Sequence, residues 1–174
     1  HSGTIYHTEK QLLSLFKIVS SINNLSLVFI GNRPRFYEVQ NMVNSISGLN
    51  KIFFHEYYNN QEENINLISC GDIGLLHVRD KWEAHRITFS NRFVEYLAAG
   101  LPVLGTPQDF AKSINDVYGC CKFYNEDDFN QLKNGLKHII ENLELDTKKA
   151  ELAKKNLSWE LESKKLLELY NTLL

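Results

Sequence analysis

Residues 91–107, NRFVEYLAAGLPVLGTP, join two patterns that together decide the fold. The first half is typical of an amphipathic helix, because Phe93, Val94 and Leu97 recur at helical spacing on one face. The second half, 101–104, is a short apolar run of the kind found in buried strands. A helix that leads directly into a buried strand predicts a sheet whose strands are connected through helices.

The same alternation extends in both directions from this segment. Apolar and β-branched runs predict strands at 3–5, 25–30, 52–54, 73–78, 102–105 and 121–124. Apolar residues at helical spacing predict helices at 8–22, 34–46, 62–69, 91–99, 108–115, 128–143, 147–156 and 158–173. Because parallel strands require crossovers, which helices supply, we expect a Rossmann-like three-layer α/β sandwich with a mostly parallel sheet. No internal linker interrupts the alternation, so residues 1–174 are predicted to form one domain.

The composition is that of an ordinary globular domain. The chain has 174 residues, of which 43% are hydrophobic and 23% charged, and its formal net charge is −2. This balance gives no global attraction to nucleic acid, so no nucleic-acid partner is expected. No apolar run approaches the ~20 residues of a membrane-spanning helix, and no signal-peptide pattern opens the chain. We therefore expect a cytoplasmic location.

Several distinctive residues have simpler explanations than a reactive site. The three cysteines and six histidines show no metal-ligand spacing, so neither a metal nor a cofactor is expected, and Cys70 is predicted to be buried. The acidic run 125–128 precedes an apolar helical stripe, so Asp127 is expected to cap that helix. Lysine pairs at 148–149, 154–155 and 164–165 predict solvated helix faces, with weak attraction to an anionic inner-membrane surface as the alternative.

The predicted architecture also indicates where a ligand binds. In an open α/β sheet the binding crevice lies beyond the carboxyl ends of the strands. The residues that follow each predicted strand include Lys10, Arg33, Tyr57 and His77. Helix N-termini point into the same crevice, and their unpaired N–H groups and positive dipole favour anions, especially phosphates.

The helix predicted at 91–99 begins at this crevice. Ser90 is a suitable N-cap, which places Asn91 and Arg92 in the first turn, and Glu95 follows Arg92 on the same face. An arginine beside helix N–H groups suits a diphosphate, and a carboxylate one turn deeper can accept two hydrogen bonds from a sugar diol. The alternative interpretation is a solvated Arg92–Glu95 surface pair on an ordinary amphipathic helix.

Beyond these patterns, the sequence is similar to a known family. The run SNRFVEYLAAGLPVLGT resembles the motif S-N-K-x-x-E-Y-x-A-A-G-x-P-V-x-x-T in the carboxy-terminal domain of GT-B glycosyltransferases of the glycogen-synthase-like and mannosyltransferase-like group. Three further stretches resemble other parts of that domain in the same order: SGTIYHTEKQLLSLF, CGDIGLLHV and LSWELESKKLLELYNTLL. The resemblance covers essentially the whole chain from Gly3.

The resemblance implies a donor-binding lobe of a glycosyltransferase that uses a nucleotide-diphosphate sugar. By motif, Glu95 matches the glutamate that holds the ribose hydroxyls, and Ser90, Asn91 and Arg92 match the helix start that faces the diphosphate and sugar. Lys10 matches a lysine that contacts the diphosphate. The loop 55–58, with Tyr57, lies where members seat the base. An amino-terminal lobe of the same protein would hold the acceptor, which is a glycan or a lipid-linked acceptor.

Two departures from the family pattern bear on mechanism. Many retaining members carry a second glutamate eight positions before Glu95, where this chain has Ile87, and the nearest upstream glutamate is Glu83. Thr4 stands where a phosphate-binding arginine is usual, so Arg33, Arg79 or Arg86 is expected to share the phosphate charge. Two other functions stay open at this point: a GT-B-fold epimerase or phosphorylase lobe, and a non-catalytic α/β nucleotide-binding or interaction module.

Overall fold

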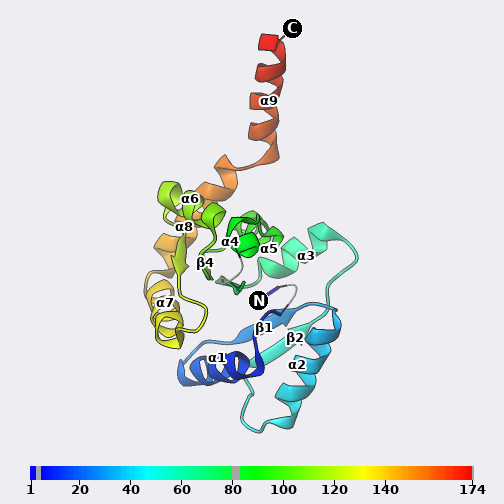
Figure 1. The fold of residues 1–174 in the computed structure, drawn as a ribbon, viewed down its shortest axis with the longest axis vertical. Helices are drawn as coiled ribbons and strands as arrows, with labels where there is room; N and C mark the ends of the chain where they lie inside the picture. The colour runs from blue at the N-terminus through cyan, green and yellow to red at the C-terminus, as the bar shows by residue number, and fades with distance from the viewer. Residues whose placement is uncertain (3–4, 80–82, 174) are drawn as a thin grey trace.

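A computed structural model describes residues 1–2, 5–79 and 83–173 (Figure 1). The strands are β1 (Leu27–Ile30), β2 (Ile52–His55), β3 (Gly74–Leu76), β4 (Val103–Gly105) and β5 (Cys121–Phe123). The helices are α1 (Glu9–Ser21), α2 (Pro34–Ser45), α3 (Gln61–Ile68), α4 (Glu83–Ile87), α5 (Asn91–Ala98), α6 (Asp109–Tyr118), α7 (Phe129–Glu141), α8 (Leu143–Asn156) and α9 (Trp159–Leu173). The predicted alternation is confirmed, and the short helix α4, which was not predicted, lies between β3 and α5.

Every strand pairing within the described residues is parallel. β1 pairs with β2, with Leu27 opposite Ile52, and a second sheet has the order β3-β4-β5. Between the two sheets lie His1 and Ser2, and Ser2 forms a parallel bridge with Ile30 at the outer edge of β1. The strand predicted at 3–5 falls largely outside the described residues. A single sheet was expected. In the described residues the strands form two parallel sheets, and Ser2 contacts both of them.

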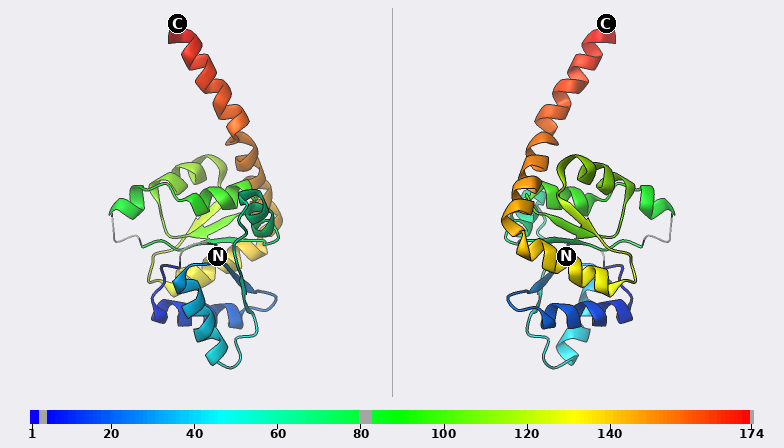
Figure 2. Two further views of the ribbon diagram at one scale, coloured as in Figure 1. Left: turned by 90° about the vertical axis from the view of Figure 1, so that its right-hand side faces the viewer. Right: turned by 90° about the vertical axis from the view of Figure 1, so that its left-hand side faces the viewer.

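Helices lie on both sides of the sheet region, in the predicted three layers (Figure 2), although Val28 of β1 and Phe53 of β2 are exposed on one face. One core packs α1, α2 and α7 against β1, and its fully buried side chains include Leu12, Phe16 and Phe29. The other core lies under α3, α5, α6 and α8 and contains Phe93 and Leu97, as the helical spacing predicted. Val94 from the same predicted apolar face is 37% exposed, and Tyr96 is buried instead.

The helix caps agree with the sequence signals, except that the cap of α7 lies one residue later than predicted. At the start of α1, Thr8 and Gln11 form the reciprocal capping box, and Gln11 Nε2 also donates to Asp127 Oδ1 at 2.9 Å. The cap of α7 is Asp128, which accepts from the Gln131 N–H at 2.9 Å. The prediction of Asp127 as the cap was therefore wrong, because its carboxylate is used in the tertiary contact that joins α7 to α1.

The final helix, α9, extends away from the rest of the domain (Figures 1 and 2). Its predicted apolar stripe does not reach either core, since Trp159, Leu166 and Tyr170 are all exposed. Lysines of α8 and α9 pair with acids one turn away, as in Lys165–Glu162 at 2.6 Å, which fits the expected solvated faces. Among the described residues, no helix is long and apolar enough to cross a membrane.

Gly74 at the start of β3 should be essential for stability, because the ring of Tyr96 covers it. A Cβ at Gly74 would lie 2.5 Å from Tyr96 Cγ, and Tyr96 is itself buried. We expect Gly74→Ala to destabilise the domain by about 1–3 kcal/mol through overpacking. Gly71→Ala is the matched control, since its nearest neighbour would be Ile68 O at 3.4 Å, an ordinary contact. Urea unfolding of both variants would measure the difference; equal midpoints would contradict this packing.

Candidate functional site

A cavity of about 340 Å³ opens beyond the carboxyl ends of β2 and β3, beside the start of α5. Its described lining residues come from five separate segments of the chain: Tyr6, Tyr57, Val78, the stretch Thr88, Phe89, Ser90, Asn91, Arg92 and Glu95, and Gln108. The structure therefore brings together five residues predicted from the sequence, namely Tyr57, Ser90, Asn91, Arg92 and Glu95. This is the edge where an open α/β sheet is expected to bind ligands.

The start of α5 forms one wall of the cavity. Ser90 is the N-cap, as predicted, although its side chain makes no capping hydrogen bond. Just before the cap, Phe89 packs against Phe110 of α6, at 4.2 Å between ring centroids. The first N–H groups of a helix have no partner within the helix, so this wall favours a negatively charged ligand.

Arg92 is fixed at the cavity wall by contacts from the amino-terminal segment. Its Nη1 donates to Ser2 O at 3.4 Å and lies 3.4 Å from His1 Nε2. Its guanidinium also lies 5.2 Å from the centre of the Tyr6 ring, in cation–π geometry. These contacts hold a positive charge beside the start of α5, where the helix dipole adds to the attraction for an anion.

Glu95 lies one turn further along α5 and is half-buried. Burial raises the pKa of its carboxyl, and the nearby Ser2 hydroxyl and Arg92 partly offset this effect. Ser2 Oγ donates to Glu95 Oε2 at 3.3 Å. Burial also raises the pKa of Tyr57 to about 12, with the Ser2 hydroxyl and Glu95 as its neighbours. The cavity thus offers an acceptor carboxylate and a neutral phenol close together.

A pair of buried imidazoles, His7 and His77, directly adjoins the lining residues Tyr6 and Val78 in the chain. The rings of His7 and His77 stack at 3.7 Å, and His77 Nδ1 is hydrogen bonded to the Tyr124 hydroxyl at 3.0 Å. Burial lowers the pKa of His7 well below its usual value, and the charges of His77 and Arg92 lower it further. His77 is only 1% exposed, so the structure places it in the interior and not among the described lining residues of the cavity.

Folding stability should therefore fall in acid. A histidine with a lowered pKa is neutral when folded but binds a proton when unfolded below about pH 6.5, so acid favours the unfolded chain. The buried amino group of His1, whose pKa burial lowers to about 5, acts in the same direction between pH 8 and 5. We expect the free energy of unfolding to decrease from pH 8 to pH 5, measured by urea titration. The decrease should be smaller in His7→Phe; an unchanged slope in that variant would contradict the assignment to His7.

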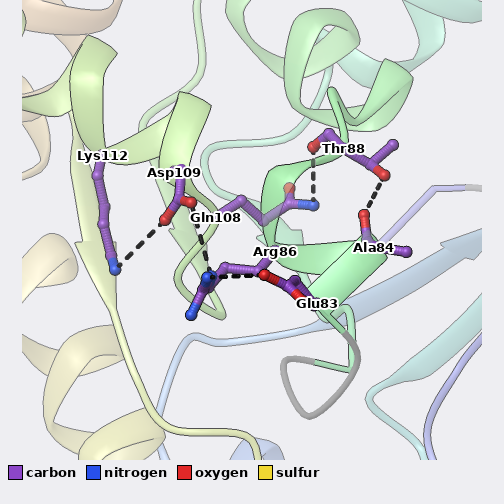
Figure 3. A network of polar contacts seen from close by, with 7 residues as sticks. All are labelled: Glu83, Ala84, Arg86, Thr88, Gln108, Asp109 and Lys112. Carbon is purple, nitrogen blue, oxygen red and sulfur yellow. Dashed lines mark hydrogen bonds and ion pairs between the residues drawn. The ribbon is translucent and has the colours of Figure 1, made fainter.

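Helix α4 directly precedes the lining residues Thr88 to Arg92 and is tethered to α6 (Figure 3). Arg86 lies between Glu83 at 3.7 Å and Asp109 at 3.6 Å, and Asp109 also approaches Lys112. Gln108 Nε2 donates to Thr88 O at 3.4 Å, so the segment that follows α4 is held against the start of α6. These ion pairs are largely exposed, which makes each worth less than about 1 kcal/mol.

The remaining predicted residues lie outside the described lining of the cavity. Lys10 is exposed in the first turn of α1, and Arg33 is exposed at the N-cap of α2. Cys70 is exposed, so its predicted burial was wrong: the residue follows α3 in a surface turn. Within the described ranges, no group of three or more histidine, cysteine or acidic side chains could hold a metal ion.

The residues at the cavity that sequence reasoning missed include the lining residues Tyr6 and Gln108, and also Ser2, which hydrogen bonds to Glu95. Tyr6 and Gln108 lie in segments that follow predicted strands. Because ligands bind beyond the carboxyl ends of strands, these segments were expected near the site, but nothing singled out these two side chains. The role of Ser2 could not be predicted from the sequence, because its hydrogen bond to Glu95 joins residues 93 positions apart.

The fold and the cavity define an α/β domain with a Rossmann-like arrangement and an anion-favouring helix start in its ligand crevice. A sequence profile of the glycosyl transferases group 1 family matches residues 1–142. The chain belongs to this family, as its resemblance to GT-B enzymes predicted, and is therefore a domain of the glycosyltransferase class. A comparison with curated proteins gave no match.

Proposed function

We propose that this domain binds a nucleotide-diphosphate sugar in the cavity at the start of α5, for transfer of the sugar to a glycan or lipid-linked acceptor. The observation that carries the proposal is the position of Arg92 and Glu95 on one wall of a single cavity. A glycosyltransferase domain implies a nucleotide-sugar donor, and this wall has a cation for the diphosphate and a carboxylate for the ribose.

The diphosphate would lie against the start of α5, between Ser90, Asn91 and Arg92. When the bond between the sugar and the diphosphate breaks, negative charge develops on the leaving phosphate oxygen. The Arg92 guanidinium and the helix N–H groups would stabilise that charge. In this proposal, protein groups stabilise the charge on the leaving diphosphate, and no metal ion is required.

The nucleoside would occupy the part of the cavity between Glu95 and Tyr57. Glu95 would accept hydrogen bonds from both ribose hydroxyls. These bonds would replace the hydrogen bond that the Ser2 hydroxyl donates to Glu95 in the structure. From the loop 55–58, Tyr57 would present the edge of its ring or its hydroxyl to the base. His77 would act indirectly, by supporting the adjoining lining residue Val78, because its own side chain is buried.

Further cations are proposed to complete the diphosphate site. Lys10 follows Tyr6 by four positions, so its flexible side chain is a candidate for a second phosphate contact, together with Arg33. Arg86 is another candidate, since α4 directly precedes the lining residue Thr88 and the ion pairs of Arg86 are long and exposed. These residues would compensate for Thr4 at the usual arginine position.

The acceptor and any general base are proposed to lie in an amino-terminal lobe of the same protein. The 174-residue chain would then bind nucleotide without turning over substrate. We also propose a cytoplasmic reaction, with peripheral contact to the inner membrane through the full-length protein.

Isothermal titration calorimetry with UDP, GDP, ADP and their sugar conjugates tests donor binding. We expect saturable one-to-one binding for the conjugates of one base, and weaker binding of the matching nucleoside monophosphate, which lacks one phosphate. No measurable heat with any nucleotide, together with an unchanged melting temperature, would overturn the proposal in favour of a non-catalytic interaction module.

A further inference from the structure

A single buried hydroxyl connects the chain segments that follow strands β3 and β4. Thr106 comes directly after β4, and 0% of its surface is exposed. Its Oγ1 accepts from the Val78 N–H at 2.9 Å and donates to Val78 O at 2.7 Å. One side chain therefore satisfies both main-chain polar groups of Val78, which is itself buried.

The spacing of the β3–β4 ladder shows which bonds this hydroxyl replaces. The two strands pair in parallel, and the Thr106 N–H donates to Leu76 O at 3.0 Å as a ladder bond. In a parallel pair the same bonds recur two residues further on. The Val78 N–H would then donate to Thr106 O, and Val78 O would accept from the Gln108 N–H. The Thr106 hydroxyl takes the place of both partners, so the ladder ends at this point.

The end of the ladder coincides with the opening of the cavity. Val78 and Gln108, which a continued ladder would join, both line the cavity at the start of α5. A side-chain oxygen between two main chains holds them further apart than the spacing of about 4.8 Å between paired strands. The hydroxyl thus keeps the segment 106–108 away from the segment that follows β3.

We propose that Thr106 is a positioning residue of the cavity, whose hydroxyl ends the β3–β4 ladder and holds Val78 and Gln108 apart where the donor sugar binds. Thr106 acts through these two residues, since it is not among the described residues that line the cavity. The assignment of the sugar rests on the proposed function, which concerns the same cavity.

The donor sugar is assigned to this part of the cavity by the positions of the other ligand groups. The proposed function places the diphosphate at residues 90–92 and the nucleoside between Glu95 and Tyr57. Val78, Thr88 and Gln108 then remain on the described wall. Gln108 Nε2 donates to Thr88 O at 3.4 Å, so the segments that carry these residues lie together. The transferred sugar is the part of the donor that is left to occupy this space.

Binding to Thr106→Val tests the proposal, because valine has nearly the shape of threonine but has no hydroxyl. The ligands are the tightest-binding sugar conjugate of UDP, GDP or ADP and the matching nucleoside diphosphate, titrated calorimetrically. We expect at least roughly tenfold weaker binding of the conjugate and less than about threefold change for the diphosphate. Thr106→Ser keeps the hydroxyl and should restore the conjugate affinity. If the valine variant does not fold, Thr106→Ala gives the same comparison.

Two results would overturn the assignment. Equal losses for the conjugate and the diphosphate would show a general effect on folding, as would similar losses in Ile139→Val, a control in the core away from the cavity. A serine variant as weak as the valine variant would show that the hydroxyl is not responsible.

Hydrogen exchange in the ligand-free protein tests the hydroxyl separately from the proposed function. In Thr106→Val, the Val78 amide should exchange at least about tenfold faster where it has lost its partner. Where the ladder instead extends into the cavity, the Gln108 amide should exchange at least about tenfold more slowly. Unchanged rates at both amides would overturn the role of Thr106, whatever the protein binds. A changed rate in a protein that binds no nucleotide would support this role and contradict the proposed function alone.

Discussion

Replacing Glu95 with alanine should weaken binding of the preferred nucleoside diphosphate by roughly 30- to 1000-fold. The carboxylate is proposed to accept hydrogen bonds from two ribose hydroxyls, and losing both would cost about 2–4 kcal/mol of binding free energy. Glu95 is half-buried on the cavity wall, so water replaces these bonds poorly. Calorimetric titration of the variant would measure the change.

The same variant should weaken the free nucleoside by a similar factor, because the nucleoside keeps the ribose diol. Glu63→Ala on α3 is the matched control, since it removes an exposed carboxylate and should leave the affinity unchanged. Comparable affinities for Glu95→Ala and the unmodified protein would exclude Glu95 as the ribose acceptor. The melting temperature of each variant would show whether a loss of binding reflects the lost contact with Ser2.

Replacing Arg92 with alanine should weaken the diphosphate by roughly 10- to 100-fold, through loss of charge-assisted hydrogen bonds. In contrast to Glu95→Ala, this variant should leave the affinity for the free nucleoside almost unchanged, since no phosphate is present. Its affinity for the diphosphate should also depend less on salt concentration. Arg92→Lys keeps the charge, and lysine is the commoner residue in the motif that this chain resembles, so partial retention is expected.

Titrations of diphosphate and nucleoside at low and high salt measure these effects. Equal losses for both ligands in Arg92→Ala would mean that the residue acts by holding the cavity open, through its contacts with Tyr6 and Ser2, and not by binding phosphate. Together, the Glu95 and Arg92 variants locate the ribose and the diphosphate of the ligand in the cavity.

The sequence predicted most of the fold because its local signals agree with one another. The apolar spacing at 8–22, Ser90 as the N-cap of α5 and the apolar run of β4 each gave the correct element. The errors arose where a tertiary contact decided the outcome. Asp127 binds Gln11 across the fold, so the neighbouring Asp128 caps α7.

The candidate site was predictable to a similar extent, and for the same reason. The start of α5 is local, so Ser90, Asn91, Arg92 and Glu95 could be predicted from one segment, and all four line the cavity. His77 follows a strand, where successive side chains alternate between faces, and its ring lies in the interior beside Tyr124. The contribution of Tyr6, Gln108 and Ser2 depends on how distant segments meet, which periodicity does not reveal.

The central claim is that a nucleotide-diphosphate sugar binds at the start of α5. Its most direct test is a titration of the ¹⁵N-labelled protein with the tightest-binding donor, followed by backbone NMR. We predict saturable shifts of the amides of residues 88–95, Tyr57 and Gln108, with the largest at Asn91 and Arg92. Shifts confined to other surfaces, or no shifts at saturating donor, would contradict the account.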